Sequence, residues 1–582
     1  MGERGSYQLT HHVPTLQVPT TVQGVLAARI DRLAPEEKAL LQQLAVIGRE
    51  FLVSLLRQVI PQPEEELYRL LASLQHKEFL YEQPAFPEVE YIFKHALTQE
   101  VAYGTVLQER RKSLHEKIAQ AIEALYRTNL EDHYSDLAHH YSRSGNAAKA
   151  VEYLSLAGQQ AVQRSAHPEA ITHLTAAVEL LGTFPDTKAR AQQDLTLQTT
   201  LGSVFLAAKG YTAPEVEQTY ARARQLCQQL DDISQIIPVL AGQWLFYALR
   251  TEHQLARGLA EQCLHLSQGT QDSAHLVTAH YMLGQSLLWL GEIGPARRHL
   301  QQGSGLYNAE QHHALAARYG EDPGSVCLAF EAHALFILGY PDQALQKNRE
   351  AITLAQELGD SFTLAQALAL AAYVRLYRRD AQAAQAEAER AIAASREHEF
   401  PFWLAFATIL RGGTLTELGD LTEGILQMHQ GLADYRATGA GWCVPDFLAR
   451  LAKGLGEVGQ IEDGLILITE AQALVEKSQE RWHEADIYRI KGELTLQSKV
   501  QSLKSKVEEE AEECFQKAIA IAQKQQAKSL ELRAVMSLAR LWQSQGKLAD
   551  AHKLLSEVYN WFTEGFDTKD LQEAQALLEE LS

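Results

Sequence analysis

The fold is decided by a short stretch at residues 419–431, which reads GDLTEGILQMHQG. A turn glycine opens this stretch, and two further glycines, Gly424 and Gly431, stand seven positions apart. Because seven residues make two helical turns, both glycines lie on one face of a helix, where a neighbouring helix can approach closely. The same frame returns at residues 459–471, GQIEDGLILITEA, 40 positions further on.

Pairs of mostly small residues with this spacing recur every 40 residues from about residue 200 to the C-terminus. Two wider steps, of 48 and 47 residues, follow Ala296 and Gly464 and predict longer loops there. The residues assigned to repeat packing are Ala256, Ala296, Ala344, Ala351, Ala384, Ala391, Gly424, Gly431, Gly464, Ala471, Ala511, Ala518 and Ala551. The remaining members of the pairs are Val216, Ala223, Cys263, Gly303 and Val558. A fixed period of this length on helical segments is typical of stacked helix pairs.

Glycines also mark the turns between the two helices of a pair. They stand five positions before the first small residue at Gly291, Gly339, Gly419, Gly459 and Gly546. A glycine there can adopt the left-handed conformation that ends a helix. We therefore predict an all-α fold over most of the chain, a tetratricopeptide-like α-solenoid built from helix pairs of about 40 residues.

Residues 18–104 follow a different plan. Amphipathic helices are predicted at Val22–Leu33, Glu36–Ile47 and Leu67–His76. Two strands, Phe79–Tyr81 and Val89–Phe93, flank the turn-rich segment Pro84–Pro87. Three helices followed by one β-hairpin predict a small winged-helix domain in front of the solenoid.

These patterns divide the chain into four parts. Residues 1–17 are expected to be a linker remnant, and residues 18–104 the winged-helix domain. Residues 105–185 are expected to form a helical transition with the first irregular helix pairs. Residues 186–582 are expected to form the tetratricopeptide-like superhelix, which grows by adding layers and so escapes the size limit of a single core.

The charge balance narrows the kinds of partner. The chain holds 53 basic and 73 acidic residues, a net charge of −20, which argues against phosphate backbones and anionic membranes as general partners. No stretch of the sequence is convincing as a membrane span. The five cysteines lie far apart without metal-ligand spacing, so disulfides are not expected and a cytoplasmic location fits best.

Winged helices often read DNA, so the charge of the recognition helix matters. The candidate recognition helix, Glu64–Lys77, carries three glutamates against Arg69 and Lys77. A duplex-binding face is expected to be basic, because the neutralisation of phosphates supplies most of the affinity. We therefore favour a role in intramolecular packing over binding to nucleic acid, and transcriptional regulation through this domain stays a second alternative.

Five segments carry a resemblance to a known family: Val18–Leu33, Leu41–Phe51, Phe93–Tyr103, Leu137–Tyr141 and Ala157–Gly158. Together they resemble the region that follows the nucleotide-binding domain in large bacterial signalling ATPases of the STAND/AAA type. In that family an ATPase module, often fused to a class III adenylate or guanylate cyclase or to a protein kinase domain, precedes a winged helix and a long tetratricopeptide-like array. The resemblance extends from about Gly5 to Ser582.

The catalytic parts of that family have no counterpart in this sequence. The phosphate-binding pattern G-x-x-x-x-G-K-[ST] is missing, and the lone Gly546-Lys547 is followed by Leu548. Without the glycine-rich loop and its lysine, no phosphate cradle can be assigned. We therefore expect no cofactor and no enzymatic activity. The chain is expected to be either the C-terminal piece of a longer reading frame or a stand-alone regulator descended from one.

Two features of the array are candidates for binding a partner. Arg375, Arg378 and Arg379 form a dense basic cluster inside an acidic array, and they could line a groove for an acidic peptide segment. Solvated charges at the end of a repeat are the alternative. Trp403 belongs to a set of aromatic residues on helical segments, which pack into cores by default but act as anchors where a concave face exposes them.

Three neighbouring histidines are candidate metal ligands. His133, His139 and His140 lie close in sequence, but their spacing on a helix does not let three ligands converge. Structural histidines at a seam between helices are the favoured interpretation, and no metal site is expected. His312 and His313 fall in one of the longer loops and are expected to be exposed to solvent.

The predicted function is regulatory. We expect a non-catalytic sensor arm of a bacterial signal-transduction ATPase, whose array binds a peptide, a partner protein, or an upstream NTPase or cyclase module. The alternative is a C-terminal fragment of an adenylate or guanylate cyclase or of a kinase, whose catalytic and ATP-binding domains lie upstream. The sequence does not specify the ligand, the oligomeric state or the pathway.

Overall fold

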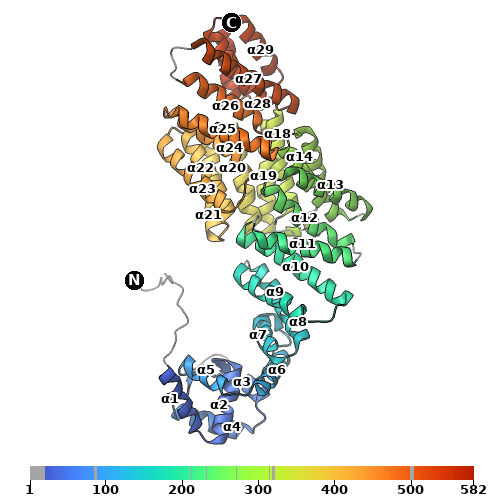
Figure 1. Cartoon of the computed structure of the whole chain (residues 1–582), viewed down its shortest axis with the longest axis vertical. Helices are drawn as coiled ribbons and strands as arrows, with labels where there is room; N and C mark the ends of the chain where they lie inside the picture. The colour runs from blue at the N-terminus through green and yellow to red at the C-terminus, as the bar shows by residue number, and fades with distance from the viewer. Residues whose placement is uncertain are drawn as a thin grey trace. The chain divides into compact units, whose positions relative to one another are not determined.

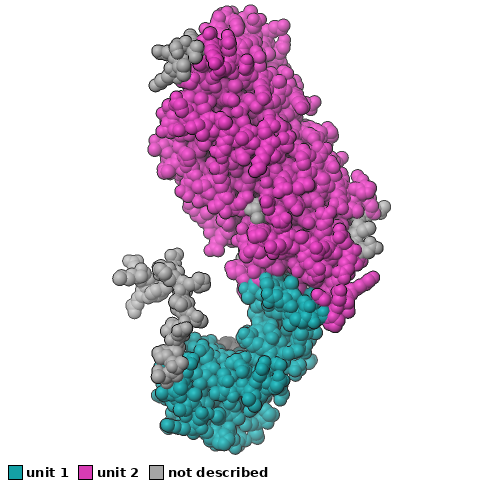
Figure 2. Space-filling view, in the orientation of Figure 1, with its two compact units in different colours: residues 1–160, 172–184 teal, residues 161–171, 185–582 magenta. Residues whose placement is uncertain are grey.

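Helices follow one another along most of the chain (Figure 1). A computed structural model describes residues 20–83, 88–164, 166–210, 213–230, 233–270, 272–312, 315–316, 321–498 and 504–582. The expected linker at 1–17 and the segment Pro84–Pro87 lie outside these residues. The chain divides into two units, residues 1–160 with 172–184 and residues 161–171 with 185–582 (Figure 2).

The first unit begins with a small sheet and the helices around it. Its elements are, in order, α1 (Thr20–Asp31), α2 (Pro35–Ile47), β1 (Glu50–Leu52), α3 (Val53–Val59), α4 (Glu64–His76), β2 (Leu80–Gln83), β3 (Glu90–Phe93) and α5 (Ala96–Gly104). The strands form one antiparallel sheet in the order β1-β3-β2, with Phe51 opposite Tyr91 and Tyr81 opposite Ile92. The predicted hairpin of β2 and β3 is confirmed.

The sequence does not predict β1 and α3. Strand β1 has three residues, too few to show an alternating pattern, and α3 begins directly after it. Phe51 on β1 is nevertheless buried, and its ring stacks on that of Tyr91 with centroids 6.5 Å apart. The missed strand therefore supplies an aromatic side chain to the core. Further helices follow: α6 (Gln108–Leu125), η1 (Leu130–His133), α7 (Tyr134–Ser144), α8 (Ala147–Gln163) and α9 (His167–Leu181).

Inner and outer helices alternate in the second unit, which is a tetratricopeptide-like α-solenoid, as predicted. The inner helices are α12 (Ile233–Leu249), α14 (Ser273–Trp289), α18 (Pro323–Leu338), α20 (Ser361–Arg378), α22 (Pro401–Glu417), α24 (Val444–Glu457), α26 (Glu484–Gln497), α28 (Lys528–Ser544) and α30 (Lys569–Leu581). The outer helices are α11 (Pro214–Leu230), α13 (His253–Thr270), α15 (Ile293–Leu306), α19 (Pro341–Leu358), α21 (Ala381–Glu397), α23 (Leu421–Ala437), α25 (Ile461–Ser478), α27 (Lys504–Gln525) and α29 (Leu548–Tyr559). Helix α10 (Lys188–Lys209) precedes them, and the short α16 (Ala309–His312) follows α15.

Burial distinguishes the two kinds of helix. Inner helix α20 is buried on almost every side, whereas outer helix α21 buries one stripe of five residues, Ala384, Ala388, Ala391, Ile392 and Ser395. A helix buried all round lies between other helices, and a helix with one apolar stripe lies at a surface. The solenoid therefore has a dense interior made by the inner helices.

Every small-residue pair lies on an outer helix and is buried. A Cβ atom added at Gly424 would stand 2.7 Å from the carbonyl oxygen of Gly412 on α22. One added at Gly431 would stand 2.8 Å from Cγ1 of Ile409 on the same helix. Such distances are too short for carbon, so larger residues would force α22 and α23 apart. The structure thus places these residues at the seam within a repeat.

The turn glycines adopt the predicted left-handed conformation. Their φ angles lie between 79° and 97° at Gly291, Gly339, Gly419, Gly459 and Gly546. Two other residues, Thr251 and Arg379, occupy the corresponding turn position with φ angles of 66° and 62°. A residue with a Cβ atom is strained there by roughly 1–3 kcal/mol. Arg379 is therefore an outlier that calls for a local explanation.

Successive turns of the superhelix lie directly against each other. The Ser529 hydroxyl of α28 donates to the Phe336 carbonyl oxygen of α18 at 2.6 Å across 193 residues, and Figure 1 shows these two helices side by side. The Arg481 amide donates to the Trp289 carbonyl oxygen at 2.7 Å, and the Gly441 amide to the Leu249 carbonyl oxygen at 2.8 Å. One turn therefore takes about five repeats of 40 residues.

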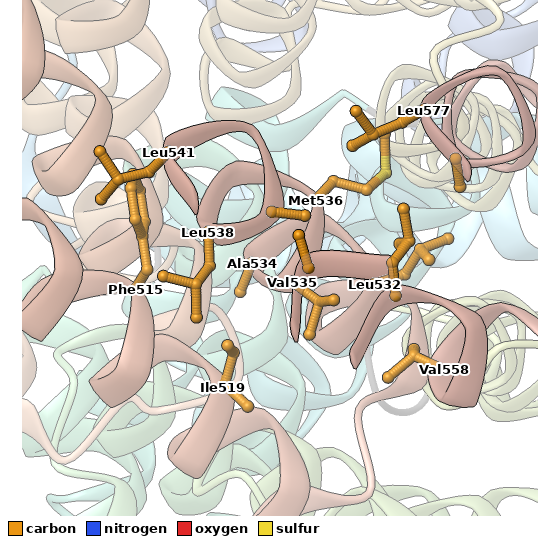
Figure 3. Packing of buried hydrophobic residues seen from close by; sticks show 14 of the residues in the cluster. Phe515, Ile519, Leu532, Ala534, Val535, Met536, Leu538, Leu541, Val558 and Leu577 are labelled. Atoms are coloured by element: carbon orange, nitrogen blue, oxygen red, sulfur yellow. The ribbon is translucent and has the colours of Figure 1, made fainter. Parts of the chain in front are cut away.

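The last repeats are closed by a hydrophobic cluster on α27 to α30. Phe515, Leu538, Leu541 and Leu577 are among its buried side chains (Figure 3). Helix α30 contributes Leu577 from the end of the chain, so it covers the apolar face that the last full pair would otherwise expose. The packing of α30 in this cluster also holds the acidic residues at the beginning of the helix in place.

Candidate functional site

The arginines predicted to bind a partner are ion-paired within the second unit. Arg375, near the end of α20, pairs with Asp380 and Glu387, each at 2.8 Å. Arg378 is 8% exposed and pairs at 2.7 Å with Asp567, which lies 189 residues further along the chain. Arg378 therefore joins two successive turns of the superhelix.

The ion pairs of Arg379 account for its strained backbone conformation. Its guanidinium pairs with Glu573 at 3.0 Å, with Asp570 at 3.2 Å and with Glu417 at 3.7 Å. Burial alone would lower the pKa of Arg379, but these carboxylates raise it above its usual value. Three ion pairs thus offset the cost of an arginine in a turn that favours glycine.

An ionic cavity of about 170 Å³ lies beside Arg379, lined by the six inner helices from α20 to α30. Its basic side chains are Arg379, Arg450, Lys453, Arg489, Arg533 and Arg540. Its acidic side chains are Glu417, Asp486, Glu493, Asp570 and Glu573. Each cation has a carboxylate between 2.5 and 3.2 Å away. We call Arg378, Arg379 and Arg533, with Asp567, Asp570 and Glu573, the ionic clamp.

A buried polar network continues from the ionic cavity into the interior. Asp446 accepts hydrogen bonds from the Tyr373 hydroxyl at 2.8 Å, from Arg450 Nε at 2.9 Å and from the Tyr377 hydroxyl. Burial alone would raise the pKa of Asp446, but the charge of Arg450 and these hydrogen bonds hold it below the usual range. The carboxylate is therefore ionised and pins α24 to α20.

Trp403 does not lie with the three arginines. It is 3% exposed and lines an aromatic cavity on the inner helices, together with Trp289 and Trp442. The residues predicted to bind a partner therefore belong to separate places in the second unit. The three arginines pair with carboxylates, and the Trp403 indole lies among other rings.

A groove with a different charge pattern lies where two turns of the superhelix meet. It measures about 530 Å³ and is lined by Gly294, Arg297, Arg298, Gln301, Leu338, Tyr340, Gln526, Lys528 and Trp561. These residues come from α15, from the end of α18 and the turn after it, from the turn before α28 and its first residue, and from the segment just after α29. We call it the cationic groove, because its lining holds three basic side chains and no carboxylate.

Aromatic rings organise the floor of the cationic groove. The Tyr340 and Trp561 rings meet edge to face with centroids 5.5 Å apart. The Arg297 guanidinium lies 5.4 Å from the Tyr340 ring centroid, and Lys528 Nζ lies 5.8 Å from that of Trp561. Trp561 is 36% exposed. An exposed indole beside cations is a common anchor for a binding partner.

The cations of the groove differ in their partners. Lys528 pairs with Glu531 at 2.6 Å. For Arg297 and Arg298, no ion pair is found among the residues that the structure describes, and Arg297 Nε is buried without a hydrogen-bond partner. The charge of Arg297 acts to lower the pKa of Glu331, but the ion pair of Glu331 is with Lys347, at 3.7 Å. The groove therefore keeps positive charge available for a ligand.

Sequence reasoning missed this groove because its walls come from distant repeats. Arg297-Arg298 stands next to the packing residue Ala296, and Trp561 stands in the last repeat. Only the five-repeat pitch of the superhelix brings them together. One signal was readable, since an arginine doublet on an outer helix lacks the acidic neighbours that follow Arg378 and Arg379.

The histidines occupy structural positions. His140 Nδ1 lies 2.9 Å from His115 Nδ1 at the seam of α6 and α7, and burial lowers the pKa of His140 to about 2 and that of His115 to about 4. His139 contacts Arg143 and His133 contacts Asp136. The expectation for His312 is wrong.

His312 is 3% exposed. Its ring hydrogen-bonds to the Ser273 hydroxyl at 2.9 Å and to the Asn308 amide at 3.0 Å, so His312, at the end of α16, lies against the beginning of α14. His313 lies outside the described residues. In the part of the chain that the structure covers, no group of three or more His, Cys, Asp or Glu side chains could hold a metal ion. Within the same residues, every helix is too short or too polar to cross a membrane.

Comparisons with known proteins give one relative in sequence and several in structure. No protein-family model matches the chain. It is 23% identical over 524 residues to an uncharacterised protein of Rhizobium meliloti (strain 1021), covering 89% of the chain and 50% of that protein. The chain thus spans about half the length of this relative.

Similar solved structures include a Rap protein complexed with competence and sporulation factor, at a TM-score of 0.49 and 12% identity, covering 64% of this chain and 98% of that one. Another is a STAND protein with a tetratricopeptide repeat sensor from Pyrococcus horikoshii, at a TM-score of 0.31 and 12% identity, covering 96% of this chain and 67% of that one. These scores are low, so the assignment of the fold rests on the helices and turns described above.

Proposed function

We propose that the chain is the sensor arm of a bacterial signal-transduction ATPase, a non-catalytic cytoplasmic module that binds an acidic segment of a peptide or partner protein in the cationic groove. The observation that carries this proposal is the absence of an ion-pair partner for Arg297 and Arg298 among the described residues. In a chain of net charge −20, unneutralised arginines beside an exposed indole attract negative charge and offer an apolar contact.

An acidic peptide segment suits the groove in charge and in size. Its volume of about 530 Å³ lies within the range of sites that hold small organic ligands, and a few side chains of a peptide fill such a space. Arginine binds carboxylates through two parallel hydrogen bonds. The rings of Tyr340 and Trp561 offer a surface for an apolar side chain between the acidic ones. Salt is expected to weaken such binding, because the charges are partly exposed.

The first unit supports the link to an ATPase. Its order α2-β1-α3-α4-β2-β3, with a sheet ordered β1-β3-β2, agrees with the winged helix that we propose for this domain. We assign this domain the task of passing the bound state of the array to a nucleotide switch, as the family resemblance implies. The carboxylates around Arg57 and Arg69 of this domain, at Glu64, Glu36 and Glu66, speak against DNA as its partner.

The length of the R. meliloti relative agrees with this proposal. Half of that protein lies outside the matched region, which leaves room for a further module joined to an array of this kind. In the family that the sequence resembles, such a module is an ATPase, often joined to a cyclase or kinase domain.

The test is association in trans with an ATPase module from the same genome, encoded in frame upstream of the chain or beside it. Isothermal titration calorimetry of the separately expressed proteins is expected to show a complex. Its dissociation constant is expected to rise about tenfold or more between roughly 50 and 300 mM salt, because the contact is electrostatic. No association at low salt would contradict the proposal.

A pair of double variants locates the contact. Arg297→Gln with Arg298→Gln removes two charges from the groove and is expected to weaken the complex about tenfold or more. Arg349→Gln with Arg396→Gln removes two charges from exposed positions on α19 and α21 and is expected to leave the affinity unchanged. Equal losses in both double variants would mean that net charge alone drives the association.

A further inference from the structure

A second site lies in the ionic cavity. The cationic groove shares no residue with it, so what binds here does not depend on the function assigned to the groove. The cavity measures about 170 Å³, more than ten times the roughly 10–15 Å³ that one water molecule needs. Side-chain exposure falls from 48% at Arg540 and 36% at Lys453 to 11% at Arg489, so Arg489 lies deeper in the cavity than the other two. The cavity therefore has room for a small organic molecule.

Two guanidinium groups in the wall keep unused N–H donors. Arg450 bonds to Asp446 through Nε alone. Arg489 bonds to Asp486 through Nε and to Glu493 through Nη1. Among the described residues, no hydrogen bond is found for the terminal nitrogens of Arg450 or for Nη2 of Arg489, and these nitrogens do not belong to the buried atoms that lack a partner, so they retain accessible surface. The wall therefore offers donors of the kind that bind a carboxylate.

Contacts within the protein hold these two guanidinium groups in place. The guanidinium carbon of Arg450 lies 3.9 Å from the centroid of the Tyr377 ring. Arg489 Nε bonds to Asp486 at 2.6 Å, and its Nη1 bonds to Glu493 at 2.8 Å. Because the two side chains are already fixed, a guest that binds their unused donors costs little further side-chain entropy.

Carboxylate oxygens beside these donors are also unused. Among the described residues, no hydrogen bond is found for Oδ2 of Asp486 or for Oε2 of Glu493, and neither belongs to the buried atoms that lack a partner. Burial alone would raise the pKa of Asp486, but the charges of Arg489 and Arg533 hold it below the usual range. Burial would likewise raise the pKa of Glu493, and the charge of Arg489 lowers it. Both carboxylates are therefore ionised and can accept hydrogen bonds from an ammonium group.

The balance of charges in the wall favours a guest without net charge. The lining holds six basic and five acidic side chains, and Asp446, which pairs with Arg450, makes the two numbers equal. A purely anionic guest would be repelled by the free oxygens of Asp486 and Glu493. A purely cationic guest would be repelled by the free N–H groups of the arginines. A small zwitterion meets an opposite charge at each of its ends.

We propose that the ionic cavity binds a free α-amino acid, whose carboxylate accepts from the unused guanidinium donors and whose ammonium group donates to the unused carboxylate oxygens. Arg489 bonds to both Asp486 and Glu493, so the unused donors and acceptors lie side by side. An α-amino acid matches this arrangement, because a single carbon atom joins its two charged groups. Apolar side chains complete the lining and suit a small aliphatic side chain on the guest: Leu376, Ile490 and Met536.

The test is isothermal titration calorimetry of the full chain with L-alanine as the probe. Three matched compounds serve as controls: propionate lacks the ammonium group, L-alaninamide lacks the carboxylate, and alanyl-alanine holds its two charges further apart. L-alanine is expected to bind, and each control to bind at least about fivefold more weakly, because charged groups of the wall stay unpaired. If L-alanine does not bind, or if any control binds as tightly as L-alanine, the proposal is overturned.

A matched pair of variants locates the ammonium group. Glu493→Gln removes a negative charge from the wall and is expected to weaken the binding of L-alanine about fivefold or more, while propionate binds no more weakly than before. Glu470→Gln removes a negative charge from an exposed position outside the cavity and is expected to leave both affinities unchanged. Equal losses for L-alanine and propionate in Glu493→Gln would contradict the contact with the ammonium group. The comparison of compounds on the wild type stands even if that variant fails to fold.

Discussion

Two clusters of arginines in the second unit meet opposite surroundings. In the ionic clamp, Arg378, Arg379 and Arg533 are each held by carboxylates at 2.7 to 3.2 Å from another turn or repeat. In the cationic groove, Arg297 and Arg298 have no such partner among the described residues. The first cluster is conspicuous in the sequence and is used for structure. The second is inconspicuous and keeps its charge for a ligand.

The difference teaches that the density of cations along a sequence does not mark a binding surface. An arginine is free to attract an acidic partner only where the fold places no carboxylate beside it. Breaking the clamp should therefore cost stability, whereas neutralising the groove should cost binding. The tests below begin with the largest expected effect.

Asp570→Ala is expected to be the most damaging single change in the clamp. Asp570 pairs with Arg379 at 3.2 Å and with Arg533 at 2.7 Å, and its side chain is 10% exposed. Removing it leaves two partly buried arginines without this partner, which costs about 3–5 kcal/mol. Urea unfolding should show this loss.

The control for that change is Glu470→Ala. Glu470 pairs with Arg436 at 2.6 Å, and both side chains are 43% exposed. An exposed pair contributes about 0–1 kcal/mol. If the two variants lose the same stability, the clamp is no more than a surface ion pair.

Glu321→Gln tests a buried carboxyl that, unlike those of the ionic clamp, has among the described residues no ion-pair partner strong enough to offset its burial. The pKa of Glu321 is raised from 4.5 to about 7 by burial, so between these values the folded state binds more protons than the unfolded state. Wild-type stability should therefore fall as the pH rises from about 4.5 to 7. At pH 8 the variant should be more stable than the wild type by about 2–3 kcal/mol.

The measurement is the urea midpoint of both proteins at several pH values. The variant should lack the part of the pH dependence that lies between about 4.5 and 7. A difference between the two proteins that does not change with pH would show that Glu321 keeps its ordinary pKa in the folded chain.

Trp244→Phe and Trp442→Phe compare a bonded indole with an unbonded one. Both rings are buried and lose the same volume, so the difference between the variants isolates the N–H group. Trp244→Phe breaks the bond to Ser286, whereas Trp442→Phe removes a donor without a partner. The first should be more destabilising by about 1–2 kcal/mol in urea unfolding. The reverse order would mean that the Trp442 N–H is bonded in solution.

Arg298→Gln is expected to have the smallest effect on stability. Its side chain is exposed and has no ion pair among the described residues, so the free energy of unfolding should change by less than about 0.5 kcal/mol. Thermal unfolding checks this. A loss as large as that of Asp570→Ala would show that Arg298 belongs to a structural network.

The sequence predicts how the solenoid is built. The seven-residue spacing of Gly424 and Gly431 places them on one helix face, and the structure puts that face against α22. The turn glycines have the predicted backbone conformation. Both properties are local to one repeat, and local periodicity carries them.

The sequence does not predict what the turns of the superhelix bring together. Arg379 meets Asp570, and Arg297 shares a groove with Trp561, only because one turn takes about five repeats. That pitch depends on small rotations between repeats, which no residue pattern shows. The same limit applies to Trp403, which lines a cavity together with Trp289 on α14, Phe330 on α18 and Trp442 before α24.

The central claim is that the unpaired cations of the groove receive an acidic partner. Fluorescence anisotropy of a labelled peptide with four glutamates and one tryptophan, titrated with the full chain, tests it most directly. Binding to the wild type is expected, at least tenfold weaker binding to the Arg297→Gln, Arg298→Gln variant, and unchanged binding to the Arg349→Gln, Arg396→Gln variant. Equal affinity for all three proteins would contradict the claim.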